Sequence, residues 1–278
     1  MKSKIAIVTG ASSGIGAATA ELLANSGYKV YGTSRKVSQA TQRSYQMIAL
    51  DVNSEASIEA ALTEIIRMEG RIDLVVNNAG FGIAPGGAEE SSIEQTKMMF
   101  DTNFFGIVRM THAVVPYMRK QGEGRIINIG SILGLIPAPY MATYAATKHA
   151  VEGFSESLDH ELRTRGIRVS VVEPGYTNTQ FEANAPEVDA KLDEYNIARK
   201  ALAKLIKIAV AGGDDPKVVA NVVLKAANAK HPKLRYAAGK LACRLSFLRR
   251  FAPAALVDSG IRKELRLDSL EIIANQAS

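Results

Sequence analysis

A glycine-rich loop near the start of the chain separates a segment typical of a buried strand from one typical of a helix. The loop is Thr9-Gly10-Ala11-Ser12-Ser13-Gly14-Ile15-Gly16, preceded by apolar residues 4–8 and followed by helical spacing up to Gly27. Free N–H groups and the helix dipole at such a turn attract a pyrophosphate, and glycines let the backbone approach it closely. In a first strand–helix unit this loop favours a dinucleotide site over simple helix capping.

The rest of the chain continues the alternation of apolar runs and helical patterns. Predicted strands lie at 4–9, 28–33, 46–50, 72–77, 124–130, 167–173 and 233–236. Helical stretches lie near 14–26, 54–69, 93–120, 143–165 and 186–212, with another from 216. We therefore expect one α/β domain over residues 1–278. It would be a doubly wound Rossmann fold with a parallel sheet of about seven strands, a substrate loop at about 182–212 and a helical C-terminal extension at about 240–278, broken at Pro253 and Gly260.

Composition limits the classes of protein that fit. The chain enters its first strand at once and has no apolar run of 18 residues, so we expect no signal peptide and no membrane span. Its one cysteine, Cys243, suits a reducing cytoplasm. The histidines lack metal-ligand spacing, so we expect no metal; they are His112, His149, His160 and His231.

Positive charge gathers near the C-terminus. Residues 230–266 hold ten Lys or Arg and two acids, and Leu241, Leu245, Leu248 and Phe251 recur at roughly helical spacing. We expect this stripe to close a substrate pocket or an interface. A solvated basic helix face is favoured over contact with nucleic acid or lipid, so we expect no nucleic-acid partner and at most weak peripheral membrane contact.

The end of the second strand predicts which nucleotide binds. An acid there would accept from the ribose 2′-hydroxyl of NAD, but this chain has Ser34 followed by Arg35. A guanidinium can bind a 2′-phosphate, which favours NADP(H) over NAD(H), although Arg35 alone could also be a solvated loop residue. Further cofactor contacts are expected from strand ends at Asp51, Val52, Asn78, Ala79 and Gly80.

A tyrosine and a lysine share one face of a later helix. Tyr144 and Lys148 are four residues apart, and a neighbouring ammonium favours the phenolate and so lowers the pKa of a phenol. Ser131 ends a buried strand and could hold a substrate oxygen, while Asn103 lies in a helical stretch and could anchor a water. A lone Tyr/Lys pair at this spacing is usually an exposed pair on a helix surface with no catalytic role. Tyr140 has no lysine four residues later, so we expect it to form part of a pocket wall.

Together these motifs resemble the short-chain dehydrogenase/reductases. The resemblance covers residues 4–181 and rests on Thr9-Gly10-x-x-x-Gly14-x-Gly16, Asn77-Asn78-Ala79-Gly80, Asn103, Ser131, Tyr144-x-x-x-Lys148 and Pro174-Gly175-x-x-x-Thr179. Thr33-Ser34-Arg35, Phe181 and Arg235-Tyr236-x-x-Gly239 carry a less specific likeness to the branch of 17β-hydroxysteroid dehydrogenase type 1.

The resemblance implies a hydride transfer between a nicotinamide and a carbonyl or secondary alcohol. Tyr144 would be the acid/base, Lys148 would lower its pKa and bind the ribose, Ser131 would orient the substrate and Asn103 would hold a relay water. Thr177, through its backbone, and Thr179 would fix the carboxamide, and Pro174 and Gly175 are further expected cofactor contacts. The expected substrate contacts are Ser131, Leu133, Tyr140, Tyr144, Tyr176 and Phe181, which suit a hydrophobic, steroid-, retinoid- or lipid-like molecule.

Other classes fit less well. Gly-x-Ser-x-Gly is absent around Ser131 and no Gly-Lys-Ser/Thr occurs, which argues against a serine hydrolase and a P-loop enzyme. A non-catalytic NADP-binding regulatory or scaffold protein, or an NAD-dependent alcohol dehydrogenase, stays open as an alternative. We expect a homo-oligomer, either a dimer or a tetramer.

Overall fold

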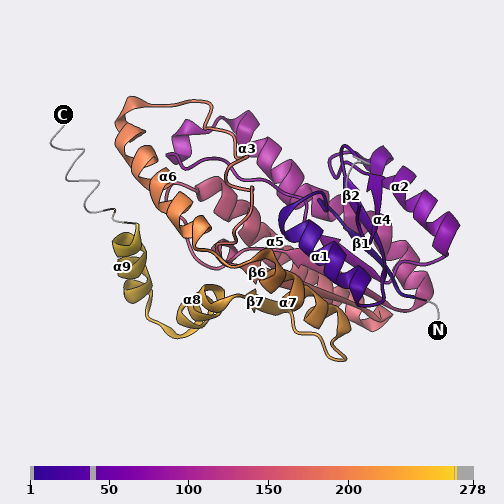
Figure 1. The fold of residues 1–278 in the computed structure, drawn as a ribbon. Coiled ribbons are helices and arrows are strands. Elements are labelled where there is room, and N and C mark those ends of the chain that lie inside the picture. Colours follow the sequence, from indigo (N-terminus) through magenta and orange to yellow (C-terminus); the bar gives the residue numbers. More distant parts are fainter. Residues whose placement is uncertain (1–2, 38–41, 266, 268–278) are drawn as a thin grey trace.

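The centre of the molecule is a seven-stranded parallel sheet (Figure 1). The structure, a computed structural model, describes residues 3–37, 42–265 and 267. The strands are β1 (Ile5–Val8), β2 (Lys29–Ser34), β3 (Gln46–Ala49), β4 (Leu74–Asn77), β5 (Gly124–Ile129), β6 (Ile167–Pro174) and β7 (Arg235–Ala238). Their order, β3-β2-β1-β4-β5-β6-β7, reverses between β1 and β4 and confirms the doubly wound Rossmann fold.

Helices cover both faces of this sheet. They are α1 (Gly14–Asn25), α2 (Glu55–Glu69), α3 (Ile93–Phe100), α4 (Gly106–Gln121), α5 (Ala142–Leu162), α6 (Asn196–Ala211), α7 (Pro216–Asn228), α8 (Lys240–Phe251) and α9 (Ala254–Glu264). Buried side chains of α2, α4 and α5 pack on one face of the sheet, and those of α1 and α7 pack on the other.

Each strand contributes alternate side chains to the two cores. Ile5 and Ile7 of β1 join the core under α2 and α4, whereas Ala6 and Val8 join the core under α1 and α7. Because both faces are covered, the strands read as continuous apolar runs in the sequence.

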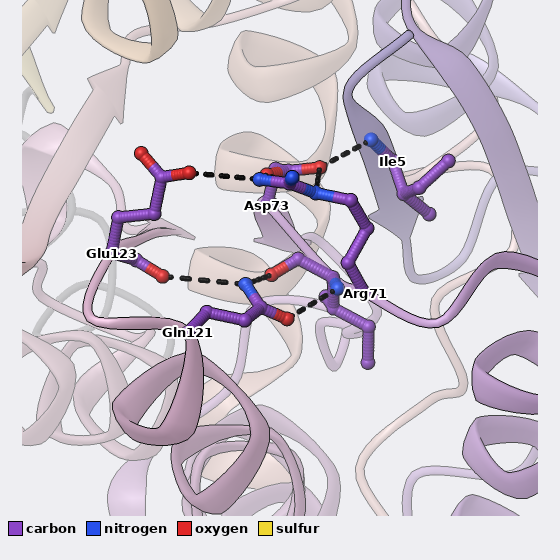
Figure 2. A network of polar contacts seen from close by, with 6 residues as sticks. Ile5, Arg71, Asp73, Gln121 and Glu123 are labelled. Carbon is purple, nitrogen blue, oxygen red and sulfur yellow. Dashed lines mark hydrogen bonds and ion pairs between the residues drawn. The ribbon is translucent and has the colours of Figure 1, made fainter. Parts of the chain in front are cut away.

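A polar network ties the strands together at their amino ends (Figure 2). Asp73, just before β4, accepts a bond of 2.7 Å from the backbone N–H of Ile5 and pairs with Arg71. Arg71 also pairs with Glu123 at 2.8 Å. The side-chain amide of Gln121 accepts a bond from the backbone N–H of Ile72 and donates one to its carbonyl oxygen, both at 2.9 Å. This network lies at the edge opposite to the expected ligand crevice.

Three expected elements differ in detail. The stretch 93–120 is divided into α3, a π-helical segment at Asp101–Phe105 and α4. In the region 182–212 only α6 is a regular α-helix, and the seventh strand is shifted to 235–238. The predicted break at Gly260 is wrong, since Gly260 lies inside α9; a glycine weakens a helix by about 1 kcal/mol but does not block its hydrogen bonds.

The C-terminal helices lie with α6 at the end of the molecule opposite the N-terminus (Figure 1). Ala242 is the one buried residue of α8, and α9 has none. The remainder of the expected extension, residue 266 and residues 268–278, lies outside the described residues. Among the described helices, none combines the length and the apolar character needed to span a bilayer.

Candidate active site

One large cavity opens at the carboxyl ends of the strands. Its volume is about 1280 Å³, above the range of about 300–1,000 Å³ usual for small-molecule pockets. Most of the expected site residues line it: Gly10, Ser12, Ser13, Gly14, Ile15, Ser34, Arg35, Asp51, Val52, Asn78, Ala79, Gly80, Ser131, Leu133, Tyr144, Lys148, Pro174, Gly175, Tyr176, Thr177, Thr179 and Phe181. Three expected residues, Gly16, Asn103 and Tyr140, lie outside its lining.

The glycine loop is held in a conformation that favours glycine. Gly10 and Gly14 have φ values of 66° and 56°, in the left-handed region. A Cβ on Gly16 would lie 2.3 Å from the carbonyl oxygen of Gly10 and 2.5 Å from Nδ2 of Asn78. The missing side chain of Gly16 therefore allows α1 to pack closely beneath the loop, and its contact with the cofactor stays a prediction.

Thr9 and Asn78 fix this loop to the end of β4. The Thr9 hydroxyl accepts bonds of 2.9 and 3.0 Å from the backbone N–H groups of Asn78 and Ala79. Asn78 Nδ2 in turn donates to the carbonyl oxygens of Thr9 and Gly10, at 2.9 and 3.2 Å. The backbone of the loop is thus held in place by side chains of the protein itself.

The nucleotide end of the cavity carries positive charge. Ser34 and the exposed Arg35 line it, opposite Asp51 and Val52. Sequence reasoning missed Arg43, whose guanidinium donates to the carbonyl oxygen of Ser12 at 3.0 Å and so clamps the glycine loop from outside. No motif signals Arg43, because its partner lies 31 residues earlier in the chain.

Ser131 and Tyr144, the predicted substrate-orienting and acid/base residues, lie together on the cavity wall. The Ser131 hydroxyl accepts a bond of 3.1 Å from the backbone N–H of Leu133, which leaves its own hydrogen for the phenol of Tyr144. Burial and the nearby Glu182 carboxylate raise the pKa of Tyr144 above its usual value, and the Ser131 bond lowers it in part. Tyr144 is therefore protonated near neutrality and is placed to donate a proton.

Lys148 lies beneath these two residues. Its Nζ donates to the carbonyl oxygen of Ile129 at 2.9 Å and lies 5.6 Å from the centre of the Tyr144 ring. Burial lowers the pKa of Lys148 to about 8, and the Glu152 carboxylate opposes that change. The prediction that Lys148 lowers the pKa of Tyr144 stays a prediction.

Asn103 uses its amide to bind protein groups. It lies in the π-helical segment, where its Oδ1 accepts from the backbone N–H of Phe81 at 2.9 Å and its Nδ2 donates to the carbonyl of Phe81 at 2.9 Å and to the Thr147 hydroxyl at 3.3 Å. Its side chain therefore fixes the backbone after β4 to α5, and the predicted water-holding role stays untested. π-Helical turns are frequent at functional sites.

The other end of the cavity is largely apolar. Phe181 packs its ring against Tyr144 with 6.0 Å between centroids, and the cavity continues along α6, α8 and α9. Lining residues there include Leu202, Ile206, Leu245, Leu248 and Val257. Tyr140, with a φ of 63°, lies outside the lining of this cavity, and its ring packs on that of Tyr195, 6.1 Å away, against α6. Its predicted contact with the substrate stays a prediction.

A buried acidic cluster behind the site was missed from the sequence. Glu152 pairs with Arg235 at 2.9 Å, while both carboxylate oxygens of Glu173 lack a hydrogen bond, its nearest cation being Arg235 at 3.6 Å. A Cβ on Gly130 would lie 2.9 Å from Glu152 Oε1, so the cluster lies against the backbone just before Ser131. Burial and Glu152 raise the pKa of Glu173 to about 8.

The cavity fits a dinucleotide. Left-handed glycines make its phosphate cradle, and a Cβ on Gly14 would be in contact with Thr179, so the loop faces the segment after β6. Arg35 and Asp51 offer contacts at the adenosine end, and Lys148, Thr177 and Thr179 offer them at the nicotinamide end.

Comparisons with known proteins agree with this geometry. Residues 4–189 match the family model described as short chain dehydrogenase. A 3-ketodihydrosphingosine reductase of Bacteroides thetaiotaomicron is 40% identical over 243 residues, which are 87% of this chain and 90% of that protein.

Solved structures share the fold over most of the chain. A short-chain dehydrogenase from Streptomyces avermitilis is 30% identical, with a TM-score of 0.78 and coverage of 100% of this chain and 99% of that one. Also similar is a short-chain dehydrogenase/reductase from Burkholderia phymatum in complex with NAD, with 27% identity, a TM-score of 0.74 and coverage of 84% of this chain and 89% of that one. A serine dehydrogenase complexed with NADP+ has 29% identity, a TM-score of 0.73 and coverage of 85% of this chain and 95% of that one. With this fold, this cavity and these matches, the chain belongs to the short-chain dehydrogenase/reductase family of oxidoreductases.

Proposed function

We propose that this protein is an NADP(H)-dependent oxidoreductase that interconverts a carbonyl and a secondary alcohol on a hydrophobic, lipid-like substrate. The observation that carries the proposal is the continuity of the cavity. It runs from the glycine loop past Ser131 and Tyr144 to apolar walls on α6, α8 and α9. Nucleotide and substrate would therefore meet at the Tyr144 phenol.

The side chains around the reacting carbon have separable roles. When bound, the nicotinamide supplies the hydride for reduction or accepts it for oxidation. Tyr144 Oη donates the proton to the carbonyl oxygen during reduction and takes it back during oxidation. Ser131 Oγ holds the same oxygen, and Lys148 would bind the ribose while balancing the charge on the phenolate.

Ser34 and Arg35 support the preference for NADP(H). A guanidinium at the cavity wall and the absence of a carboxylate at the end of β2 favour a 2′-phosphate, since a charge-assisted hydrogen bond contributes about 1.5–3 kcal/mol. Related structures contain either NAD or NADP+, so the family alone does not select the nucleotide.

The apolar walls support a long substrate. A steroid, a retinoid or a long-chain lipid would each fit the chemistry of Leu202, Ile206 and Leu245. The Bacteroides relative is by name a reductase of 3-ketodihydrosphingosine, which favours the long-chain lipid among these. The likeness to the 17β-hydroxysteroid dehydrogenase type 1 branch stays a prediction.

Kinetics with matched cofactors and ketones test both parts. Purified protein is assayed by the absorbance of NADPH or NADH with a series of ketones of increasing chain length. We expect kcat/KM at least tenfold higher with NADPH, and rising with chain length. Arg35→Asp should reverse the cofactor preference, whereas Arg67→Ala, at the end of α2, should leave it unchanged. Equal use of NADH and NADPH by the wild type would contradict the NADP assignment.

The single thiol of the chain bears on its cellular setting. We propose a cytoplasmic homo-oligomer, because the single thiol, Cys243, is free and exposed and so suits a reducing compartment. Light scattering of the purified protein measures the oligomeric state, and a monomer at micromolar concentration would contradict it.

A further inference from the structure

Glu182 is a carboxylate on the cavity wall that the proposed reaction does not use. It lines the same cavity as Ser131 and Tyr144 and directly follows Phe181, whose ring packs against that of Tyr144. In the described part of the chain, its carboxylate forms no hydrogen bond and no ion pair. The nearby exposed Glu187, by contrast, pairs with Lys191 at 3.2 Å.

The surroundings of Glu182 make this unusual. The side chain is partly buried, and burial raises the pKa of its carboxyl with no cation to oppose the effect. Five basic residues line the same cavity, and in the described part of the chain none of them forms a hydrogen bond or an ion pair with Glu182; they are Arg35, Lys148, Arg244, Arg249 and Lys263. A half-buried carboxylate without a partner is costly, so such a group is expected to meet a cation that arrives with a ligand.

The position of Glu182 defines where that cation would lie. Glu182 directly follows Phe181, whose ring centroid lies 6.0 Å from that of Tyr144, and Glu182, Tyr144 and Tyr176 line the same cavity. In agreement with this placement, the Glu182 charge raises the pKa values of both phenols. A positive group of the substrate at Glu182 would lie near the carbonyl carbon and would cancel the carboxylate's effect on Tyr144.

We propose that the substrate carries a protonated amine close to its carbonyl group, and that Glu182 binds this amine. The inference rests on the proposed function and narrows its substrate class to long-chain amino ketones and the corresponding amino alcohols. The apolar walls of α6, α8 and α9 hold the chain, Ser131 and Tyr144 hold the carbonyl oxygen, and Glu182 sets the orientation between them.

Three substrates separate the effect of a positive charge on the substrate from the effect of its chain. The first is 3-ketodihydrosphingosine, which has an amine on the carbon beside its ketone; the second is its N-acetylated form, which has the same chain and no positive charge. A simple long-chain ketone without nitrogen is the third substrate. For the wild type with NADPH we expect kcat/KM at least tenfold higher for the amine than for the N-acetylated form.

Variants of Glu182 then test whether its carboxylate binds the substrate amine. Glu182→Gln keeps the size of the side chain and should lower kcat/KM for the amine tenfold or more, chiefly through KM, with less than threefold change for the uncharged ketones. Glu182→Asp should recover part of the loss. Glu187→Gln, in the same segment but outside the cavity lining, is the matched control and should behave as wild type.

Each failure has its own meaning. If the wild type reduces long-chain ketones without preferring the amine, or if Glu182→Gln lowers activity equally on all three substrates, the role of Glu182 is refuted and the proposed function stands. If the folded wild type, checked by circular dichroism, turns over none of the three with either cofactor, the proposed function fails and this inference fails with it.

Discussion

Tyr144 combines two opposing influences at one phenol. Burial and the Glu182 charge favour the protonated form, while the Ser131 hydroxyl favours the phenolate. The first two effects are larger, so the phenol keeps its proton near neutrality and is suited to donate it in the proposed carbonyl reduction.

Removing the Tyr144 hydroxyl should stop turnover and leave NADPH binding intact. Tyr144→Phe is expected to lower kcat by about 10²–10⁴-fold, because proton transfer to the substrate oxygen is lost while the ring is kept. NADPH affinity, measured by fluorescence titration, should change less than threefold. Tyr140→Phe, whose ring packs on Tyr195 outside the cavity, serves as control and should retain activity. Near-normal kcat in Tyr144→Phe would refute the assignment.

The protonation of Glu173, in the buried acidic cluster, makes the stability of the fold depend on pH. Its folded-state pKa, about 8, lies above its ordinary value of 4.5, so the folded protein keeps a proton that the unfolded chain releases. The stabilising effect is complete below pH 4.5 and is lost as the pH rises toward 8.

Glu173→Gln should remove this pH dependence. Relative to wild type, the variant's free energy of unfolding should rise between pH 5 and 8, by an amount on the order of 2 kcal/mol, as measured by urea denaturation. Glu156→Gln removes an exposed partner of the same Arg235 and should shift stability by less than about 1 kcal/mol at any of these pH values. A difference between wild type and Glu173→Gln that does not change with pH would contradict the argument.

At the scale of elements, the junction of α5 and β6 depends on a single carboxylate. Asp159 is fully buried and accepts from Arg168 at 2.8 Å, from Arg163 and from the backbone N–H of Val169 at 2.8 Å. Burial alone would raise its pKa, but these donors overcome burial and hold the pKa at about 2. The junction is therefore stabilised above pH 3.8 and loses this contribution as the pH falls toward 2.

Replacing this carboxylate should weaken the whole fold. Asp159→Asn is expected to lower the free energy of unfolding at pH 7 by about 3–5 kcal/mol, since it leaves buried donors without their charge partner. The loss should shrink as the pH is lowered toward 2, where wild type also loses the charge. Denaturant unfolding at pH 7, 4 and 2.5 measures it, and a loss below 1 kcal/mol at pH 7 would contradict the role.

Elements with a strong apolar period were predictable, and others were not. β1 and β4 read as strands because both faces of the sheet are covered, and α2 and α7 show clear amphipathic spacing. The π-helical segment around Asn103 was not predicted, because it is only five residues long and is flanked by the helical patterns of α3 and α4. Glu152 and Arg235 are 83 positions apart, so the acidic cluster forms only when β7 lies beside β6.

At the scale of the whole molecule, folding of the sheet depends little on the helices at the apolar end of the cavity. The core on one face of the sheet includes Val219 and Val223 of α7 and Tyr236 of β7, so folding needs the chain to about residue 238. Beyond that point, α8 buries Ala242 and α9 buries no residue, yet both line the cavity.

Truncation after Gly239 should therefore separate folding from substrate binding. We expect the shortened protein to keep its circular dichroism spectrum and its NADPH affinity, with a melting temperature within about 5 °C of wild type. KM for long-chain ketones should rise at least tenfold, whereas short ketones should be reduced as before. An unchanged KM for the long ketones would show that the helices do not wall the site.

The weak anchoring of α8 and α9 also bears on how such a protein diversifies. Most substitutions are eliminated because they destabilise, and the tightly packed sheet leaves little margin for change. Residues such as Leu245, Leu248 and Val257 line the cavity but are hardly part of the core, so replacing them should cost little folding free energy. Selection can therefore alter the choice of substrate at this end while the nucleotide-binding half stays unchanged.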